Sequence, residues 1–139
     1  MFKFILFIVI TVLNFGCADK ENNVNTLTAE ETLIGNWNFF YVEPDCEEIW
    51  EFGADKDFKS TSLNEVVTGI YSLSEITEEN GKLPIEIEIQ NDNLQVDCRG
   101  NVSDDSGVKT NFLVEFPDQN TMHRYFNENT SLYLVLKRK

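Results

Sequence analysis

Few side chains in this sequence have the type and spacing that catalysis requires. The single histidine, His123, lies between Met122 and Arg124, a setting that favours a surface strand position over a general base. Glu86 and Glu88 alternate with isoleucines, so we expect them on the solvated face of a strand. The sequence contains neither a Gly-x-Ser-x-Gly elbow nor a phosphate-cradling glycine loop. The pattern therefore favours a binding or interaction protein over an enzyme, and it indicates no cofactor.

The first cysteine lies where an export signal would end. Cys17 follows an apolar run from Phe4 to Phe15 and one small residue, Gly16. A single basic residue, Lys3, precedes the run. The run is too short to span a bilayer, and this combination is typical of a cleaved export signal.

The segment Leu13-Asn14-Phe15-Gly16-Cys17 resembles the bacterial lipobox. The resemblance implies that residues 1–16 are a lipoprotein signal peptide and that Cys17 becomes the lipidated first residue of the mature chain. It also implies a lipid anchor in the bacterial cell envelope, at the outer membrane on its periplasmic or surface face. The alternatives are an ordinary signal peptide and an uncleaved anchor.

A change in pattern marks the start of the folded domain. Residues 17–27 are polar and show no apolar period, so we expect a lipidated tether there. Thr28, with Glu31 three residues later, predicts a capping box and a short helical turn. The expected domain therefore spans residues 28–139.

With Cys17 lipidated, Cys46 and Cys98 remain as an even pair. Export removes the chain from cytosolic reductants, so we expect a disulfide between them, with two reduced core cysteines as the alternative. Closing a loop of this length stabilises a fold by roughly 4 kcal/mol in the chain-entropy estimate. One histidine and no Cys-x-x-Cys motif offer too little for a structural zinc site, and the aspartates lack the EF-hand spacing. We therefore assign no metal.

The charge of the chain excludes two ways of binding a partner. A formal net charge of −13 over 139 residues is opposite to what nucleic acid or an anionic membrane would attract. Attachment to a membrane must then come from the N-terminal lipid. The acidity is typical of a soluble surface, and the alternative is an acidic surface for a basic envelope protein, with loops such as Asp45-Cys46-Glu47-Glu48.

From Gly35 onward the apolar residues recur with a period of two, which predicts β-strands. In the clearest case, Leu83 to Gln90, Leu and Ile take one face while Pro, Glu and Gln take the other. Turn signals rich in Asn, Asp and Gly separate most of the segments. The nine candidate strands are Asn36–Glu43, Glu47–Phe52, Lys56–Ser62, Val66–Ser74, Leu83–Gln90, Leu94–Asn101, Lys109–Phe116, Thr121–Phe126 and Leu132–Arg138.

The spacing of these strands predicts how they pair. At about twelve residues per strand and turn, the chain has no room for crossover helices, so neighbouring strands should pair antiparallel. A meander of this length must close or fold over itself to protect its edges. We predict an all-β fold, an antiparallel up-and-down barrel of eight or nine strands. The alternative is a two-sheet sandwich.

Both ends of the expected domain resemble one family. Gly35 and Trp37 open the first strand and resemble the Gly-x-Trp signature of lipocalins and of small lipocalin-like bacterial lipoproteins. Arg138 shares the inward parity of the leucines in the last strand, where lipocalins stack an arginine over that tryptophan. The resemblance implies that the three residues close one end of a lipocalin-like barrel. The cation–π contact would contribute about 0.5 to 2 kcal/mol.

Inward parity also places aromatic residues inside the barrel. Eight strands enclose just enough room for packed side chains or for one small ligand, so a filled core and a cavity both remain open. We expect either a lipocalin-like lipoprotein that binds a small hydrophobic ligand, or a filled barrel that acts as an interaction module of the inhibitor or assembly-partner type. The candidate cavity residues are Phe39, Tyr41, Trp50, Phe52, Phe112, Val114 and Phe116.

Overall fold

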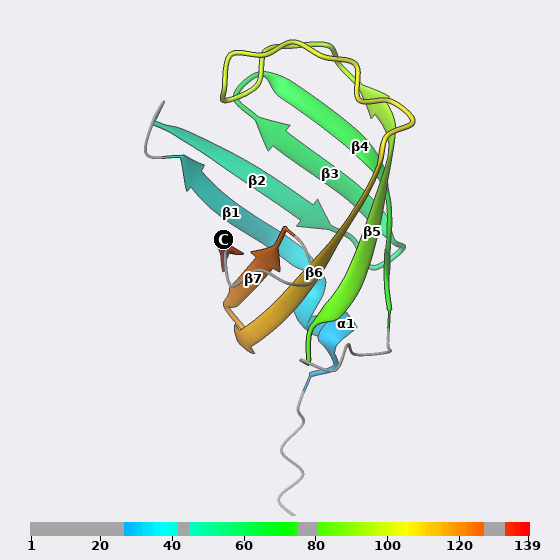
Figure 1. Ribbon diagram of the computed structural model, residues 1–139, viewed down its shortest axis with the longest axis vertical. Helices are drawn as coiled ribbons and strands as arrows, with labels where there is room; N and C mark the ends of the chain where they lie inside the picture. Colours follow the sequence, from blue (N-terminus) through cyan, green and yellow to red (C-terminus); the bar gives the residue numbers. More distant parts are fainter. Residues whose placement is uncertain (1–26, 42–44, 75–80, 127–132) are drawn as a thin grey trace, which may run out of the picture.

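The computed structural model describes residues 27–41, 45–74, 81–126 and 133–139 (Figure 1). The expected signal peptide and Cys17 lie outside this part of the chain, as does the expected tether apart from Leu27. Within the described ranges, no helix has the length and apolar character that crossing a membrane needs. The elements are α1 (Ala29–Leu33), β1 (Gly35–Tyr41), β2 (Cys46–Phe52), β3 (Asp57–Ser62), β4 (Glu65–Leu73), β5 (Leu83–Asp92), β6 (Lys109–Asp118), β7 (Thr121–Tyr125) and β8 (Tyr133–Arg138).

The strands form one closed barrel in which each strand pairs antiparallel with its neighbour in the sequence. β1 and β8 complete the barrel, with Trp37 opposite Arg138 and Asn38 opposite Lys137. The predicted up-and-down barrel is therefore confirmed, with β1 to β8 as its strands. The two-sheet sandwich is wrong.

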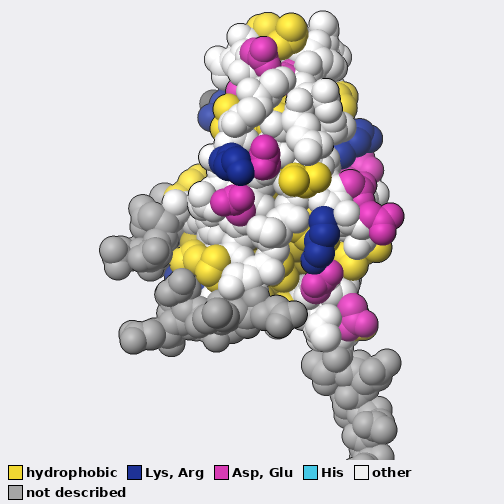
Figure 2. Space-filling model, turned by 90° about the vertical axis from the view of Figure 1, so that its right-hand side faces the viewer, with side chains coloured by type: hydrophobic (Ala, Val, Ile, Leu, Met, Phe, Trp, Pro, Cys, Tyr) yellow, Lys and Arg dark blue, Asp and Glu magenta, His cyan; other side chains and the backbone are white. Residues whose placement is uncertain are grey.

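The alternation of residue types explains which face of each strand is buried. In β5, Ile85 and Ile87 are buried in the core while the glutamates between isoleucines point outward. Lys109 of β6 pairs with Glu88 at 2.8 Å on that outer surface. Figure 2 shows the same mixture over a wider area, with Lys and Arg side chains beside Asp and Glu side chains. Glu86 and Glu88 are therefore solvated surface charges, as predicted.

The predicted capping box determines where α1 begins. The Thr28 hydroxyl accepts a hydrogen bond from the Glu31 backbone N–H at 3.1 Å, and the Glu31 carboxylate accepts one from the Thr28 N–H at 2.8 Å. These bonds satisfy N–H groups that the first turn leaves unpaired. The hydrogen bond from the Thr28 backbone also lowers the pKa of Glu31. The turn places Leu33 in the core at one end of the barrel.

The predicted strand Leu94 to Asn101 is wrong, because residues 93–108 form an irregular loop between β5 and β6. The Asp97 carboxylate accepts hydrogen bonds from the backbone N–H groups of Arg99 at 2.9 Å and Asn101 at 2.7 Å. Such bonds from a side chain to the nearby backbone compete with the hydrogen bonds of a sheet. Figure 1 shows this loop at the end of the barrel opposite α1.

Candidate functional site

Trp37 closes the end of the barrel beside α1. Its side chain is 0% exposed, and its indole N–H donates a hydrogen bond to the Leu33 carbonyl at 2.7 Å. The Arg138 guanidinium lies over the indole, 4.5 Å from the ring centroid. It also donates hydrogen bonds to the backbone carbonyls of Thr32, Ile34 and Gln119.

Gly35 provides the space that this arrangement needs. Its φ of 130° lies where side chains are disfavoured, and a Cβ atom there would be 2.6 Å from Nη1 of Arg138. With a Cβ atom at position 35, the Arg138 guanidinium would have to shift, and its hydrogen bond of 2.9 Å to the Ile34 carbonyl would be disturbed. The structure thus brings Gly35, Trp37 and Arg138 together at the closed end.

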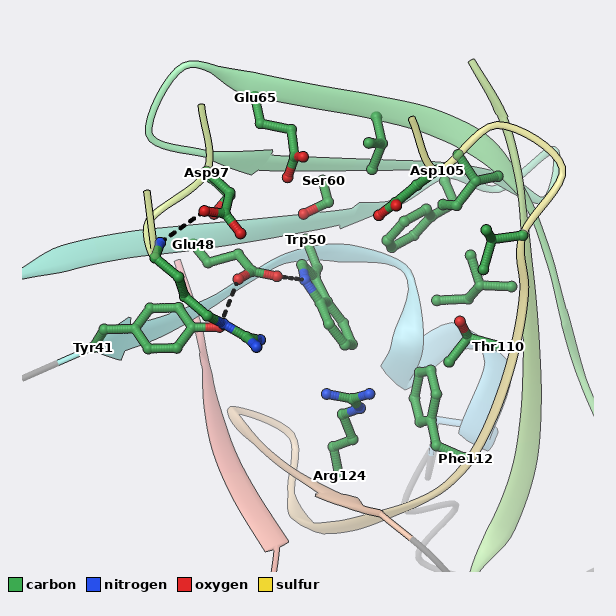
Figure 3. Close-up of a pocket in the computed structure, with 17 residues that line it drawn as sticks. Tyr41, Glu48, Trp50, Ser60, Glu65, Asp97, Asp105, Thr110, Phe112 and Arg124 are labelled. Atoms are coloured by element: carbon green, nitrogen blue, oxygen red, sulfur yellow. Dashed lines mark hydrogen bonds between the residues drawn. The ribbon is translucent and has the colours of Figure 1, made fainter. Parts of the chain in front are cut away.

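A cavity of about 210 Å³ lies in the other half of the barrel, beneath the loop of residues 93–108 (Figure 3). Three of the predicted cavity residues, Tyr41, Trp50 and Phe112, line it. Trp50 and Phe112 form an aromatic wall, with ring centroids 5.7 Å apart. Apolar side chains of β3, β4 and β5 extend that wall, among them Phe58, Val67, Ile87 and Ile89.

The other predicted cavity residues do not line this space. Phe52 and Val114 are buried in the packed core nearer Trp37, where Phe52 lies 5.1 Å from Tyr71 between ring centroids. Phe116 lies 5.9 Å from Trp37, and Phe39 packs edge-on against Tyr41 at 4.6 Å. All have the predicted inward parity, but their height along the barrel places them outside the cavity. Phe39, Phe52, Val114 and Phe116 therefore do not border this cavity, and a ligand contact by any of them stays a prediction.

The cavity also has an ionisable side that the sequence reasoning missed. Glu48 points inward from β2, where its carboxylate accepts hydrogen bonds from the Tyr41 hydroxyl at 3.0 Å and the Trp50 N–H at 2.6 Å (Figure 3). Burial raises the pKa of Tyr41. The expected acidic loop around Glu48 is wrong, because β2 begins at Cys46 and this carboxylate faces the interior. Its shared parity with Trp50 was the signal available in the sequence.

Acidic side chains gather at the mouth of the cavity. Carboxylate oxygens of Glu65, Asp92 and Asp105 lie within 4.8 Å of one another. Burial first, and then the charges of Asp92, Asp97 and Asp105, raise the pKa of Glu65 to about 7. Oxygen ligands at this spacing suit a hard cation, but exposed acidic groups are common without one, and we assign no metal.

Arg124 contributes a positive charge to the cavity from β7. Its guanidinium carbon lies 5.2 Å from the ring centroid of Trp50, 4.7 Å from that of Phe112 and 5.2 Å from that of Phe126. Its Nε atom is buried and has no hydrogen-bond partner. Burial lowers the pKa of Arg124, but an arginine remains protonated in proteins. The inward parity that Arg124 shares with Met122 could have indicated this position.

The loop of residues 93–108 is fixed over the mouth by a disulfide. Cys46 at the start of β2 bonds to Cys98 in the loop, with their Cα atoms 5.7 Å apart. The Cys98 backbone N–H also donates a hydrogen bond to the Ser62 hydroxyl at 3.1 Å. The predicted disulfide is therefore confirmed, and it holds one edge of the cavity in place.

His123 lies away from the cavity, on the outer face of β7. Its ring stacks on Tyr133 with centroids 4.2 Å apart, and its Nδ1 lies 3.6 Å from a Glu115 carboxylate oxygen. This is the strand position that the sequence predicts. Two further hollows, of about 450 and 590 Å³, lie outside the closed end around α1.

No known protein family, curated protein or solved structure matches this chain. Its class is therefore defined by the fold and the cavity. The chain is a closed eight-stranded antiparallel barrel, plugged at one end by Trp37 and Arg138. A cavity with aromatic and ionisable walls lies at the other end.

Proposed function

We propose that this protein is a lipid-anchored, lipocalin-like lipoprotein of the bacterial envelope that binds a small ligand with an apolar part inside its barrel. The observation that carries this proposal is the cavity of about 210 Å³ bordered by Trp50 and Phe112. Closed antiparallel barrels of eight strands are the architecture of lipocalins, which hold one ligand in the interior. A filled barrel was the expected mark of an interaction module, so the cavity favours the binding protein.

The dimensions of the cavity limit the size of the ligand. Pockets for drug-sized molecules typically measure roughly 300 to 1,000 Å³. At about 210 Å³, this cavity suits a smaller molecule, such as a compound with one ring and a short side chain. The faces of Trp50 and Phe112 would pack against a flat, apolar part of that molecule.

The proposed location rests on Cys17 and on the disulfide. The Cys46–Cys98 bond agrees with a chain that leaves the reducing cytosol. The acidic surface leaves the lipid as the means of membrane attachment. We expect Cys17→Ala to move the protein from the membrane fraction to the soluble fraction of a bacterial host. Retention of the variant in the membrane fraction would reject lipid anchoring at this residue.

Fluorescence provides a direct test of ligand binding, because the two tryptophans differ in position. Trp50 borders the cavity, whereas Trp37 is fully buried at the closed end of the barrel. In a Trp37→Phe variant the emission comes from Trp50 alone, so small aromatic compounds that enter the cavity should change it saturably. A Trp50→Phe variant, which retains Trp37, is the control and should respond little. An equal response of both variants would show that the compounds bind elsewhere.

A further inference from the structure

Arg124 lies in the cavity without a counter-ion. None of the ion pairs between described residues includes it. Its Nε is buried and unpartnered, and its guanidinium lies over the faces of aromatic rings. Charged groups that are removed from water are normally paired with an opposite charge, because an unpaired buried charge destabilises the folded state. Arg124 as a whole is half-buried, and its buried Nε–H remains an unsatisfied donor at this point of the barrel interior.

The groups around Arg124 do not replace a counter-ion. The Glu48 carboxylate attracts Arg124 over a distance but is hydrogen-bonded to Tyr41 and Trp50. Ring faces attract a cation more weakly than a carboxylate that accepts two parallel N–H bonds. A planar guanidinium facing a small cavity offers donors in the geometry that carboxylates fit. This is the arrangement of a binding group for an anion.

Arg124 and the carboxylates of the mouth lie on different sides of the cavity, and Arg99, which donates a hydrogen bond to the Tyr41 hydroxyl at 3.4 Å, also lines it. Figure 3 shows Arg124 on one side and the Glu65 and Asp105 carboxylates on the other, with Trp50 between them. A ligand that reaches from one side to the other would place its acidic group on Arg124. Its other end would meet carboxylates, which favour a positively charged group there and disfavour a second negative one.

We propose that the ligand is a small organic acid whose carboxylate binds Arg124, and that an amino group at its other end is favoured by the acidic mouth. This inference rests on the proposed function, because it assigns the chemistry of the ligand in the same cavity. The apolar body of the acid packs on Trp50 and Phe112. Arg124 thus sets which apolar molecules the barrel accepts.

The test uses probes that share one phenyl body and differ only in their end groups. Binding of 3-phenylpropanoate, 3-[4-(aminomethyl)phenyl]propanoate and the neutral 3-phenylpropanol is measured by calorimetry on the disulfide-bonded protein. We expect 3-phenylpropanoate to bind at least about tenfold more tightly than the alcohol, and the aminomethyl acid, whose amino group lies at the end opposite the carboxylate, at least as tightly as 3-phenylpropanoate. Tighter binding of the plain acid than of the aminomethyl acid would overturn the role of the acidic mouth.

Substitutions then assign the preference to one residue. Arg124→Gln should remove the preference for the acid, while Arg124→Lys, which keeps the charge without the planar fork, should retain part of it. Lys109→Gln changes the charge equally on the outer face of β6 and should leave binding within about threefold of wild type. If Arg124→Gln does not fold, loss of at least part of the preference in Arg124→Lys still supports the proposal. An unchanged preference in Arg124→Lys and Arg124→Gln would overturn it.

The outcomes separate this inference from the proposed function. Equal binding of the acid and the alcohol in the cavity would retain the ligand-binding barrel and reject the acidic ligand. No binding of any probe, with Trp50 emission unchanged, would count against both. The acid preference and its loss in Arg124→Gln would support both.

Discussion

Replacing the two residues of the plug tests how the barrel is closed. Trp37 is completely buried, and truncating a buried Trp to Ala typically costs about 3 to 5 kcal/mol of unfolding free energy. Arg138→Met removes two partly buried hydrogen bonds from a charged donor, to the Thr32 and Ile34 carbonyls, and a more exposed one to Gln119. At roughly 1 to 2 kcal/mol for each of the two partly buried bonds, the expected loss is about 2 to 4 kcal/mol.

The double variant isolates the contact between the two side chains. The cation–π contact at 4.5 Å is lost in either single variant, so the double variant should be more stable than the sum of the two losses predicts. We expect a difference of about 0.5 to 2 kcal/mol. Urea denaturation followed by circular dichroism measures the unfolding free energy of all three variants. The fluorescence of Trp50, which every variant retains, provides a second signal.

A matched control lies on the same strand. Phe40 is 54% exposed on the outer face of β1, and Phe40→Ala should cost less than about 1 kcal/mol. A loss below 1 kcal/mol for Trp37→Ala, or a coupling of zero with Arg138→Met, would refute the role of these residues in closing the barrel.

Three further predictions concern the other end of the barrel. Because the raised pKa of Glu65 makes the folded state bind a proton more tightly, stability should fall as pH rises from 4.5 to about 7. Glu65→Gln should remove that loss. After allowance for solvent screening, we expect the variant to be more stable than wild type by about 1 kcal/mol at pH 8 and no more stable at pH 4. A difference in unfolding free energy between variant and wild type that stays constant across this pH range would contradict the prediction. Reduction of the Cys46–Cys98 bond should cost about 2 to 5 kcal/mol, and an unchanged melting temperature with both thiols free would reject its stabilising role. Arg124→Met removes an unpaired charge but keeps apolar packing, so the ligand-free variant should lose less than about 1 kcal/mol in urea titration; a loss above 3 kcal/mol would mean that Arg124 is part of the structural core.

Much of the fold could be predicted because strand period and turn residues are local properties. The alternation in Leu83 to Gln90 predicted β5, and Thr28 with Glu31 predicted the start of α1. The same reasoning failed for Leu94 to Asn101, where the backbone N–H groups of Arg99 and Asn101 donate hydrogen bonds to the Asp97 carboxylate and hold the backbone in turns. Periodicity does not distinguish these cases, since it registers side-chain types and not competing hydrogen bonds.

The site was predictable only in part. Inward parity correctly placed Tyr41, Trp50 and Phe112 in the interior at the cavity, but the same parity holds for Phe52, which fills the core. Which inward residue borders open space depends on the stagger of all strands around the barrel, a long-range property that no single segment contains. Arg124 was missed because its charge suggested solvent, although its parity indicated the interior.

Native mass spectrometry tests most directly whether the barrel holds a ligand. The protein would be purified gently from its native source and measured before and after denaturation and refolding. A bound small molecule, present before denaturation and absent afterwards, is the predicted result, and its mass should fit the cavity of about 210 Å³. A protein that shows only its own mass in both measurements would contradict the ligand-binding function.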